Sequence, residues 1–386
     1  MGLTDALARA AVRHAHVLAA EVPGHWMTRV AVERQVLVRG WRLARSPGDA
    51  DILAVCGPPG PDLRRPLAQL WEQLPGPRTR VEVDSPRAVL VALDAAAANL
   101  RDTAAQRVDS RDRSADGQRP NGGHTRDGDA AHGHQGGTGH EGTGHEGTGH
   151  AGMGHGMAVA PAGIPLAAGG QDRDGLAMDV LHLRLGPVLA YWPGGLVLRC
   201  ALQGDVIVDA EITLVGADES TTTAAEPDGG DALRRFAARR CDNVASLLGL
   251  AGWDDAAARA RRIRDALLFT AGLDRPAGEL DRLRRIVDRS WLLRWSLRRI
   301  GPLAAPELAH HGLPASLGGD VRDRLLAMLD RAAGCLADRR PPNRPRGAPV
   351  EAIPDLVRGW DVATARLIVA SLDLDPFAAN AEVNLG

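Results

Sequence analysis

The sequence predicts two folded regions of different class. The N-terminal region is expected to be α/β, with a short parallel sheet and helices. The C-terminal region is expected to be α+β, with a small antiparallel sheet followed by a helical bundle. Three observations support this: strand-like and helix-like segments alternate over residues 1–102, aliphatic side chains are almost absent over 103–157, and alternating runs precede long helical patterns over 158–386. We therefore expect two domains joined by a linker.

In the N-terminal region, helical periodicity is interrupted by two short apolar runs. The run at 50–57 is bounded by Gly and Pro, which is typical of a buried strand. The predicted order is helix, helix, strand, helix, strand, helix, over residues 3–21, 27–44, 50–57, 62–74, 78–84 and 86–100. This alternation predicts a parallel sheet.

The stretch 103–157 consists mainly of Gly, Asp, Ser, Arg, Thr and His. Such a composition cannot bury enough apolar surface to offset the entropy lost on ordering. We expect it to be a disordered His/Gly-rich linker that tethers the two folded regions.

In the C-terminal region, strands are predicted over 181–187 and 196–216, and Gly204-Asp205 marks a hairpin turn in the second of these runs. Helices should follow over 231–250, 254–273, 279–301, 319–339 and 353–372. Asp320 is a candidate N-cap, and Asp254-Asp255 is expected at a helix N-terminus rather than as an acid/base dyad.

Composition excludes several functional classes. The chain has 46 Arg and no Lys, so it cannot contain a Walker A, Schiff-base or kinase lysine. A net charge of −2 means that no global field selects nucleic acid or an anionic membrane as a partner. The N-terminus lacks an apolar signal-peptide core, and no apolar run reaches the ~20 residues of a membrane span. We therefore expect a cytoplasmic protein without a membrane span, which could dock peripherally on the inner face of a membrane through partners.

The four cysteines are widely separated, and no two lie closer than 41 residues. Metal and redox motifs of the CxxC type are therefore absent, and we expect buried thiols in a reducing compartment. Cys56 lies in the apolar run 50–57, where burial should make its thiol inert.

A histidine repeat is the clearest local motif. Imidazole and thioether groups recur on Gly-rich spacers, with one His every five residues over most of the repeat. The candidate ligands are His132, His134, His140, His145, His150, His155, Met153 and Met157. Such groups bind Ni, Zn or Cu. Two interpretations stay open: an expanded linker with incidental metal affinity, or a segment selected for metal buffering.

Two smaller His pairs are interpreted structurally. His14 and His16 should lie on a solvated helix face, because positions i and i+2 point to different sides. His310-His311 has no third ligand nearby in sequence.

An Arg cluster and a Trp pair are also interpreted structurally. The stretch 259–299 contains twelve Arg with interleaved Asp, which indicates a salt-bridged helix surface rather than a phosphate grip. Trp291 and Trp295, at i and i+4, are expected to be core anchors.

The segment 46–83 resembles the small, cluster-bearing subunit of respiratory complex I. Ala50-Asp51, Gly57, Gln73, Pro75 and Pro77 stand in matching places. That family would place Gly-Ser-Cys after the second strand, where this chain has Asp84-Ser85-Pro86. Thiolates are the ligands of iron–sulfur clusters, so we expect no cluster here.

The C-terminal region resembles the quinone-site large subunit of complex I, a relative of nickel–iron hydrogenase large subunits. Residues 185–212 are similar to that family's first hairpin, and 239–250 to the helix that follows it. The family's His-Pro-x-x-His-Gly turn reads Trp192-Pro193-Gly194-Gly195 here, and Tyr191 is the only tyrosine. The two subunits dock on each other in that family, so the resemblance implies a fused pair stripped of cofactor ligands.

These resemblances and the histidine repeat together suggest three functions. The leading one is a degenerate, non-catalytic scaffold or accessory subunit of a complex I-like or hydrogenase-like oxidoreductase complex, with no activity alone and no catalytic or cofactor-binding residues in its folded regions. The second is a metal-buffering or delivery protein that uses the His-rich segment. The third is a quinone-reactive NADH dehydrogenase-like subunit whose clusters come from partner subunits.

Overall fold

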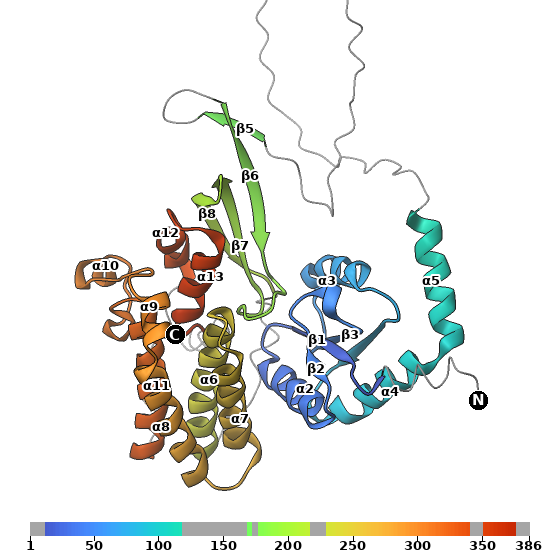
Figure 1. Cartoon of the computed structure of the whole chain (residues 1–386), viewed down its shortest axis with the longest axis horizontal. Helices are drawn as coiled ribbons and strands as arrows, with labels where there is room; N and C mark the ends of the chain where they lie inside the picture. The colour runs from blue at the N-terminus through green and yellow to red at the C-terminus, as the bar shows by residue number, and fades with distance from the viewer. Residues whose placement is uncertain (1–11, 118–167, 172–176, 217–228, 340–349, 376–386) are drawn as a thin grey trace, which may run out of the picture.

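A computed structural model describes residues 12–117, 168–171, 177–216, 229–339 and 350–375 (Figure 1). Within these ranges, an N-terminal α/β region is followed by a small antiparallel sheet and a set of helices. The predicted fold class is confirmed at this level. Among the described residues we find no helix with both the length and the apolar character needed to cross a bilayer.

The N-terminal sheet is parallel and has the strand order β2-β1-β3-β4. Its strands are β1 (His16–Glu21), β2 (Arg42–Leu43), β3 (Ile52–Cys56) and β4 (Thr79–Val83). All five residues of β3 are buried, as expected for an inner strand of a sheet covered on both faces. The predicted strands over 50–57 and 78–84 are confirmed.

Helices cover both faces of this sheet. α2 (Trp26–Val38) and α4 (Val89–Arg101) pack on one face, and α3 (Pro61–Gln73) packs on the other (Figure 1). Successive residues of β3 point to opposite faces of the sheet. Ile52 and Ala54 belong to the hydrophobic cluster under α2 and α4, and Leu53 and Val55 belong to the cluster under α3.

Two predictions near the N-terminus are wrong. A helix is expected over 3–21, but residues 16–21 form strand β1, because they pair in parallel with β2 on one side and with β3 on the other. Residues 1–11 of the expected helix lie outside the described residues. The helix expected to run to residue 44 ends at Val38. Gly40, with φ +73°, then redirects the chain into β2.

The first part of the expected disordered linker is helical: α5 spans Thr103–Gly117. Asp102 begins the helix, because its Oδ1 accepts hydrogen bonds from the backbone N–H groups of Ala104 and Ala105 (3.1 Å each). Asp109 then anchors the helix to the domain through the Arg78 guanidinium, whose Nη2 lies 3.1 Å from Asp109 Oδ1. Residues 118–157, which include every His and Met proposed as a metal ligand, lie outside the described residues.

The second sheet is antiparallel, in the order β5-β6-β7-β8. Its strands are β5 (Ala168–Gln171), β6 (Ala177–Leu185), β7 (Leu196–Gln203) and β8 (Val206–Leu214). Gly204, with φ +63°, forms the predicted hairpin turn between β7 and β8.

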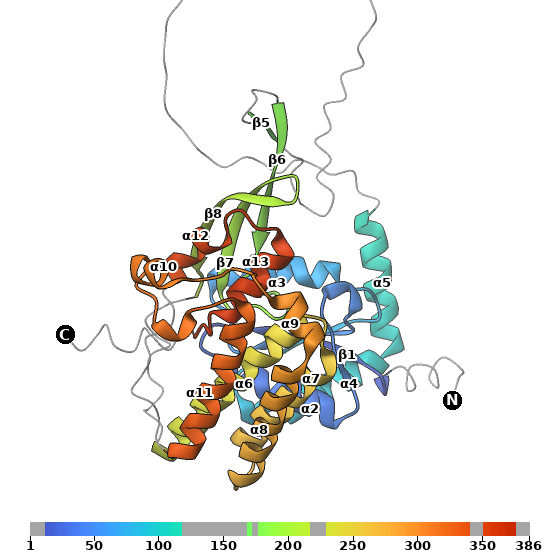
Figure 2. The same ribbon diagram turned by 60° about the vertical axis from the view of Figure 1, so that its left-hand side comes forward.

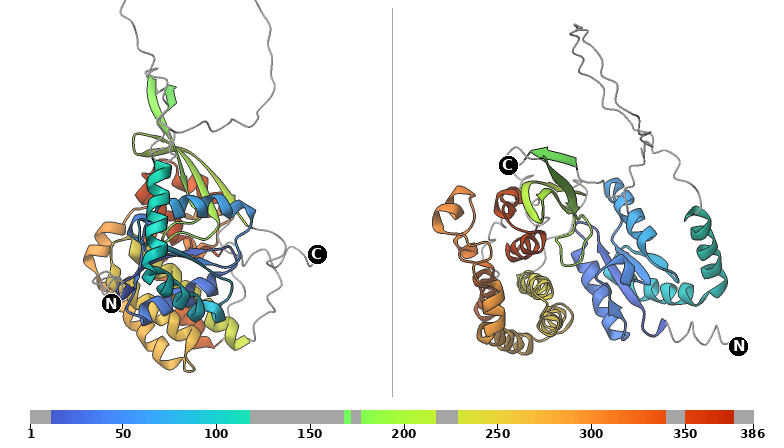
Figure 3. Two further views of the ribbon diagram at one scale, coloured as in Figure 1. Left: turned by 90° about the vertical axis from the view of Figure 1, so that its right-hand side faces the viewer. Right: turned by 45° about the horizontal axis from the view of Figure 1, so that its top comes forward.

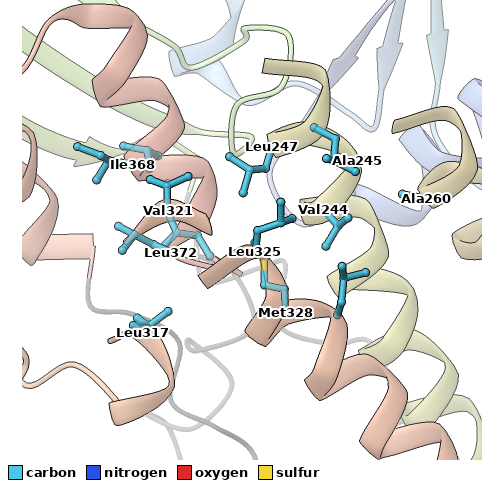
Figure 4. Packing of buried hydrophobic residues seen from close by; sticks show 14 of the residues in the cluster. Val244, Ala245, Leu247, Ala260, Leu317, Val321, Leu325, Met328, Ile368 and Leu372 are labelled. Atoms are coloured by element: carbon cyan, nitrogen blue, oxygen red, sulfur yellow. The ribbon is translucent and has the colours of Figure 1, made fainter. Parts of the chain in front are cut away.

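Helices pack beside this sheet and form the largest core (Figure 2). They are α6 (Gly229–Leu250), α7 (Asp254–Phe269), α8 (Asp274–Arg289), α9 (Trp291–Leu297), α10 (Ala305–His310), α11 (Val321–Asp338), α12 (Ile353–Val357) and α13 (Val362–Ser371). Figure 4 shows Val244 and Leu247 of α6 meeting Leu325 and Met328 of α11 in this core. Asp320 caps α11 as predicted, accepting hydrogen bonds from Arg322 N and Asp323 N.

Two helices predicted as continuous are each divided. The pattern over 279–301 breaks at Ser290, whose side chain caps α9. The pattern over 353–372 breaks at Gly359 (φ +84°), after which Asp361 caps α13. In both cases a capping side chain satisfies the N–H groups of the second helix, so the break leaves few unpaired donors.

The expectation that Trp291 and Trp295 are core anchors is wrong. Each is 76% exposed, whereas Leu293 and Leu297 of the same short helix are buried. The two Leu share one face of α9 and the two Trp share another, so only one pair can face the core.

Candidate functional site at the junction of the two regions

The candidate site lies at the carboxyl edge of the parallel sheet. In the sheet, β1 has β2 as its neighbour on one side and β3 on the other. The strand order therefore reverses direction between β1 and β3. Open α/β sheets bind ligands outside the strand ends at such a switch point. Here the strand ends are Glu21 and Cys56, and Gly194 of the C-terminal region reaches this edge, where a Cβ on it would lie 3.0 Å from Glu21 Oε1.

Figure 1 and the right-hand view of Figure 3 show the loop between β6 and β7 beside the N-terminal sheet. We call this loop, together with the first residue of β7, the 186–196 turn.

Helix α2 provides the N-terminal side of the junction. Trp26, Arg29 and Glu33 lie at i, i+3 and i+7, which places them on one face of the helix. Arg29 Nε donates to Glu21 Oε2 at 2.5 Å, and its two Nη atoms pair with Glu33 and with Asp242. One guanidinium thus ties β1, α2 and α6 together.

Helices α6 and α7 provide the other side. Arg264 of α7 is fully buried, and its Nη1 donates to Glu33 Oε2 at 2.7 Å and to Asp242 Oδ1 at 2.6 Å. Trp26 Nε1 donates to Asp242 Oδ2 at 2.8 Å. We call Glu21, Arg29, Glu33, Asp242 and Arg264 the buried ion network.

The network remains ionised in spite of burial. Desolvation alone would raise the pKa of Asp242, but Arg29 and Arg264 outweigh it and hold that pKa well below its usual range. The pKa of Glu33 is lowered in the same way: burial opposes ionisation, and the same two guanidinium groups outweigh it. Carboxylates held charged between two cations are poor candidates for general acids.

A cavity of about 120 Å³ opens beside the network. It is bounded by β1 and Arg45 from the N-terminal region and by the 186–196 turn, α6 and α13 from the C-terminal region. Its wall is mixed, with aliphatic side chains such as Val17 and Val188 next to Arg239 and Arg261. It can therefore hold several waters or part of a small amphipathic ligand.

Tyr191 occupies an unusual position in the cavity wall. Its backbone has φ +58°, the left-handed region that bulky residues rarely adopt. Its ring packs against Gly249 of α6, where a Cβ would lie 2.7 Å from Tyr191 Cζ. Arg261 Nη2 donates to the phenol oxygen at 3.4 Å, and the Arg45 guanidinium lies 5.9 Å from the ring centre.

Arg239 of α6 also lines the cavity, and it is only 8% exposed. Its Nε has no hydrogen-bond partner among the described residues, and its nearest carboxylates, on Asp375 and Asp242, lie 3.6 and 3.9 Å away. Its guanidinium stacks 5.2 Å from the Trp26 ring. Arg239 is thus the least satisfied buried cation at the junction.

The other residues predicted from sequence lie apart from this site. The solvated helix face proposed for His14 and His16 is wrong: His14 is exposed in a turn, and His16 begins β1 with Nδ1 2.9 Å from Asp49 Oδ1. His310 and His311 end α10. Asp254 and Asp255 stand in the first turn of α7, as expected for a helix N-terminus.

The cysteines are buried as predicted. Burial raises the pKa of Cys56 far above its usual value, that of Cys241 to about 12 and that of Cys200 to about 11. Within the ranges that the structure describes, no three His, Cys, Asp or Glu side chains are grouped so as to hold a metal ion.

Sequence reasoning missed the buried ion network, although a signal exists. Arg264 follows Ala257 and Ala260 at helical spacing and precedes Leu267, so it stands at a core position of its helix. The prediction that the twelve Arg of 259–299 form a salt-bridged helix surface is therefore wrong for Arg264, which is fully buried. That interpretation holds for Arg275, which pairs with Glu279, and for Arg284, which pairs with Asp330.

Comparison with known proteins finds no family model that matches the chain and no curated protein that matches it.

Proposed function

We propose that this chain is a non-catalytic scaffold or accessory subunit of a complex I-like or hydrogenase-like oxidoreductase assembly, in which its two regions act as one docked unit. The observation that carries the proposal is the buried ion network. Arg29 and Arg264 each bind carboxylates from both regions, so neither region can leave without exposing buried charges that lack partners.

The position of the network favours a structural role. At the switch point, where an open α/β sheet would bind a ligand, this chain places salt-bridged side chains that meet the other region. The Asp84-Ser85-Pro86 segment after β4 leads into α4 and supplies no thiolate at the place where the resemblance puts cluster cysteines. These salt-bridged side chains therefore serve to hold the two regions together.

The partners of such a scaffold are other subunits of the assembly. The test is a strain that lacks this chain, complemented with the full chain or with the double variant Glu33→Gln/Asp242→Asn. We expect the intact assembly on a native gel, and its quinone reductase activity, only with the unmodified chain. The proposal fails if the assembly and its activity are normal without the chain.

A second candidate function is binding of a quinone-type ligand in the junction cavity, with clusters supplied by partners. The specific observation in its favour is that the 186–196 turn and Tyr191 line the cavity. Ala190→Phe would fill the cavity, and Tyr191→Phe would remove its only phenol. Loss of quinone reduction with a normally assembled complex would favour this candidate over the scaffold; unchanged activity would favour the scaffold.

The His-rich segment stays a separate proposal, carried only by its repeat. Its ligands would be imidazoles and thioethers on Gly-rich spacers, which suit Ni, Zn or Cu buffering. Calorimetric titration of the full chain, with and without residues 124–157, tests it. Equal metal binding by the two forms would end the proposal.

A further inference from the structure

Helix α9 presents an exposed apolar surface that the functions above do not use. Trp291 and Trp295 are each 76% exposed, and Leu292 beside them is 57% exposed. Indole rings are large, so burying two of them would contribute several kcal/mol of hydrophobic free energy, which these exposed rings do not gain within the chain. An exposed cluster of this kind marks an interaction surface.

Cationic residues flank and interrupt this cluster in the sequence. Arg289, Arg294, Arg298 and Arg299 are all exposed, and residues 289–306 contain no Asp or Glu. Within the described part of the chain, none of these four guanidinium groups forms an ion pair. The contrast with Arg284, held by Asp330 on the adjacent helix, shows that nearby acids do neutralise other surface Arg.

We propose that this surface, Trp291, Leu292 and Trp295 with these four Arg, binds directly to a membrane that contains anionic lipids. We call it the α9 face. Indole and leucine side chains insert at the level of the lipid headgroups, and exposed Arg attracts anionic headgroups. Four exposed Arg without ion pairs, within a few residues of these apolar side chains, complement a negatively charged lipid surface. The inference holds whether or not the chain acts in an oxidoreductase assembly.

The fold holds the α9 face in place. Ser290 caps α9 and ends its continuity with α8, its Oγ accepting from Leu293 N at 3.3 Å. Leu293 and Leu297 are buried in the helical core, so the opposite side of α9 is kept outward. The indoles are therefore presented without the ordering cost that a disordered basic segment would incur on binding.

A second exposed apolar cluster supplies a matched control. Leu90 (52% exposed) and Val91 (74% exposed) of α4 lie near Arg39, which donates to the Leu90 carbonyl and pairs with Asp94 at 2.8 Å. This cluster is apolar and exposed, and Arg39, which contacts it, is neutralised by Asp94. If exposure of apolar groups alone caused lipid binding, both clusters would contribute.

The test is flotation of the full chain with vesicles of phosphatidylcholine alone or mixed equally with phosphatidylglycerol. The assay is run at about pH 8, where the imidazole groups of the His-rich segment are neutral. We expect binding to the mixed vesicles only, and its loss in about 1 M salt, where the Debye length falls to about 3 Å. Trp291→Ser/Trp295→Ser should weaken binding at least tenfold, and Leu90→Ser/Val91→Ser should leave it unchanged.

Arginine variants separate a lipid surface from a protein partner. Arg294→Gln/Arg298→Gln should weaken vesicle binding about thirtyfold, on the scale of about 1 kcal/mol per basic residue. Arg294→Lys/Arg298→Lys should restore it, since lipid attraction depends on charge, whereas a bidentate protein contact would not tolerate Lys. Circular dichroism checks that each form is folded. The inference is overturned if the folded, unmodified chain does not bind anionic vesicles, or if the Trp291→Ser/Trp295→Ser variant binds them equally well.

Discussion

Arg264 on α7 and Glu33 on α2 form a buried ion pair across the junction, Nη1 to Oε2 2.7 Å, although 231 positions separate them in the chain. Arg264 shares the same Nη1 with Asp242 at 2.6 Å. This single cation therefore neutralises one carboxylate from each region, and the stability of the chain should depend on it.

Arg264→Met removes that cation and leaves Glu33 and Asp242 with Arg29, and Asp242 also with the more distant Arg239 (3.9 Å). We expect a loss of about 3–5 kcal/mol in the free energy of unfolding, because breaking a buried pair strands a charge. Urea denaturation followed by circular dichroism measures it. The matched control is Arg284→Met, which breaks the exposed pair with Asp330 and should cost at most about 1 kcal/mol. Equal losses in the two variants would contradict the role assigned to the network.

Acid should weaken the junction through Asp242. The pKa of this carboxyl is depressed in the folded chain by the neighbouring guanidinium groups, which outweigh its burial. Its stabilising contribution is therefore complete above the unfolded pKa of about 3.9 and is lost as pH falls below about 4 toward the folded pKa. Thermal denaturation between neutral and acid pH should show this fall. Asp242→Asn should lower stability at neutral pH and flatten the acid limb.

Gly249→Ala should disturb the cavity wall. The added Cβ would lie 2.7 Å from Tyr191 Cζ, so the ring or the helix must shift, at a cost of about 1–3 kcal/mol. The control is Gly334→Ala on α11, where no atom lies within 4 Å of the added Cβ and the better helix propensity should stabilise by up to about 1 kcal/mol. Melting temperatures should thus move in opposite directions. Combining Gly249→Ala with Tyr191→Ala should recover part of the loss.

The four thiols should be unreactive in the folded protein. All are buried, and burial raises the pKa of Cys200 to about 11 and that of Cys241 to about 12. The thiolate is the reactive form, so an aromatic disulfide reagent at neutral pH should label almost none of them until urea is added. Rapid labelling of one thiol in the native chain would show that its segment opens.

Much of the fold could be predicted from local pattern. The apolar run that became β3, the hairpin at Gly204-Asp205 and the cap at Asp320 each depend on residues close together in sequence, so periodicity and turn chemistry were sufficient. The wrong predictions lie where contacts with residues distant in sequence determine the secondary structure. Residues 16–21 have helical periodicity but form β1, because parallel strands pair with them on both sides.

The amino-acid sequence by itself determined the two fold classes, the separation of the cysteines, the His repeat and the absence of lysine. Only the tertiary structure decided which charged and aromatic side chains are buried. Arg264 is enclosed and Trp295 is exposed, against the usual preference of each residue type. The physical reason is that burial depends on what packs against a helix face. Glu33 and Asp242 make a buried cation favourable on α7, and Leu293 and Leu297 leave no room in the core for the indoles of α9.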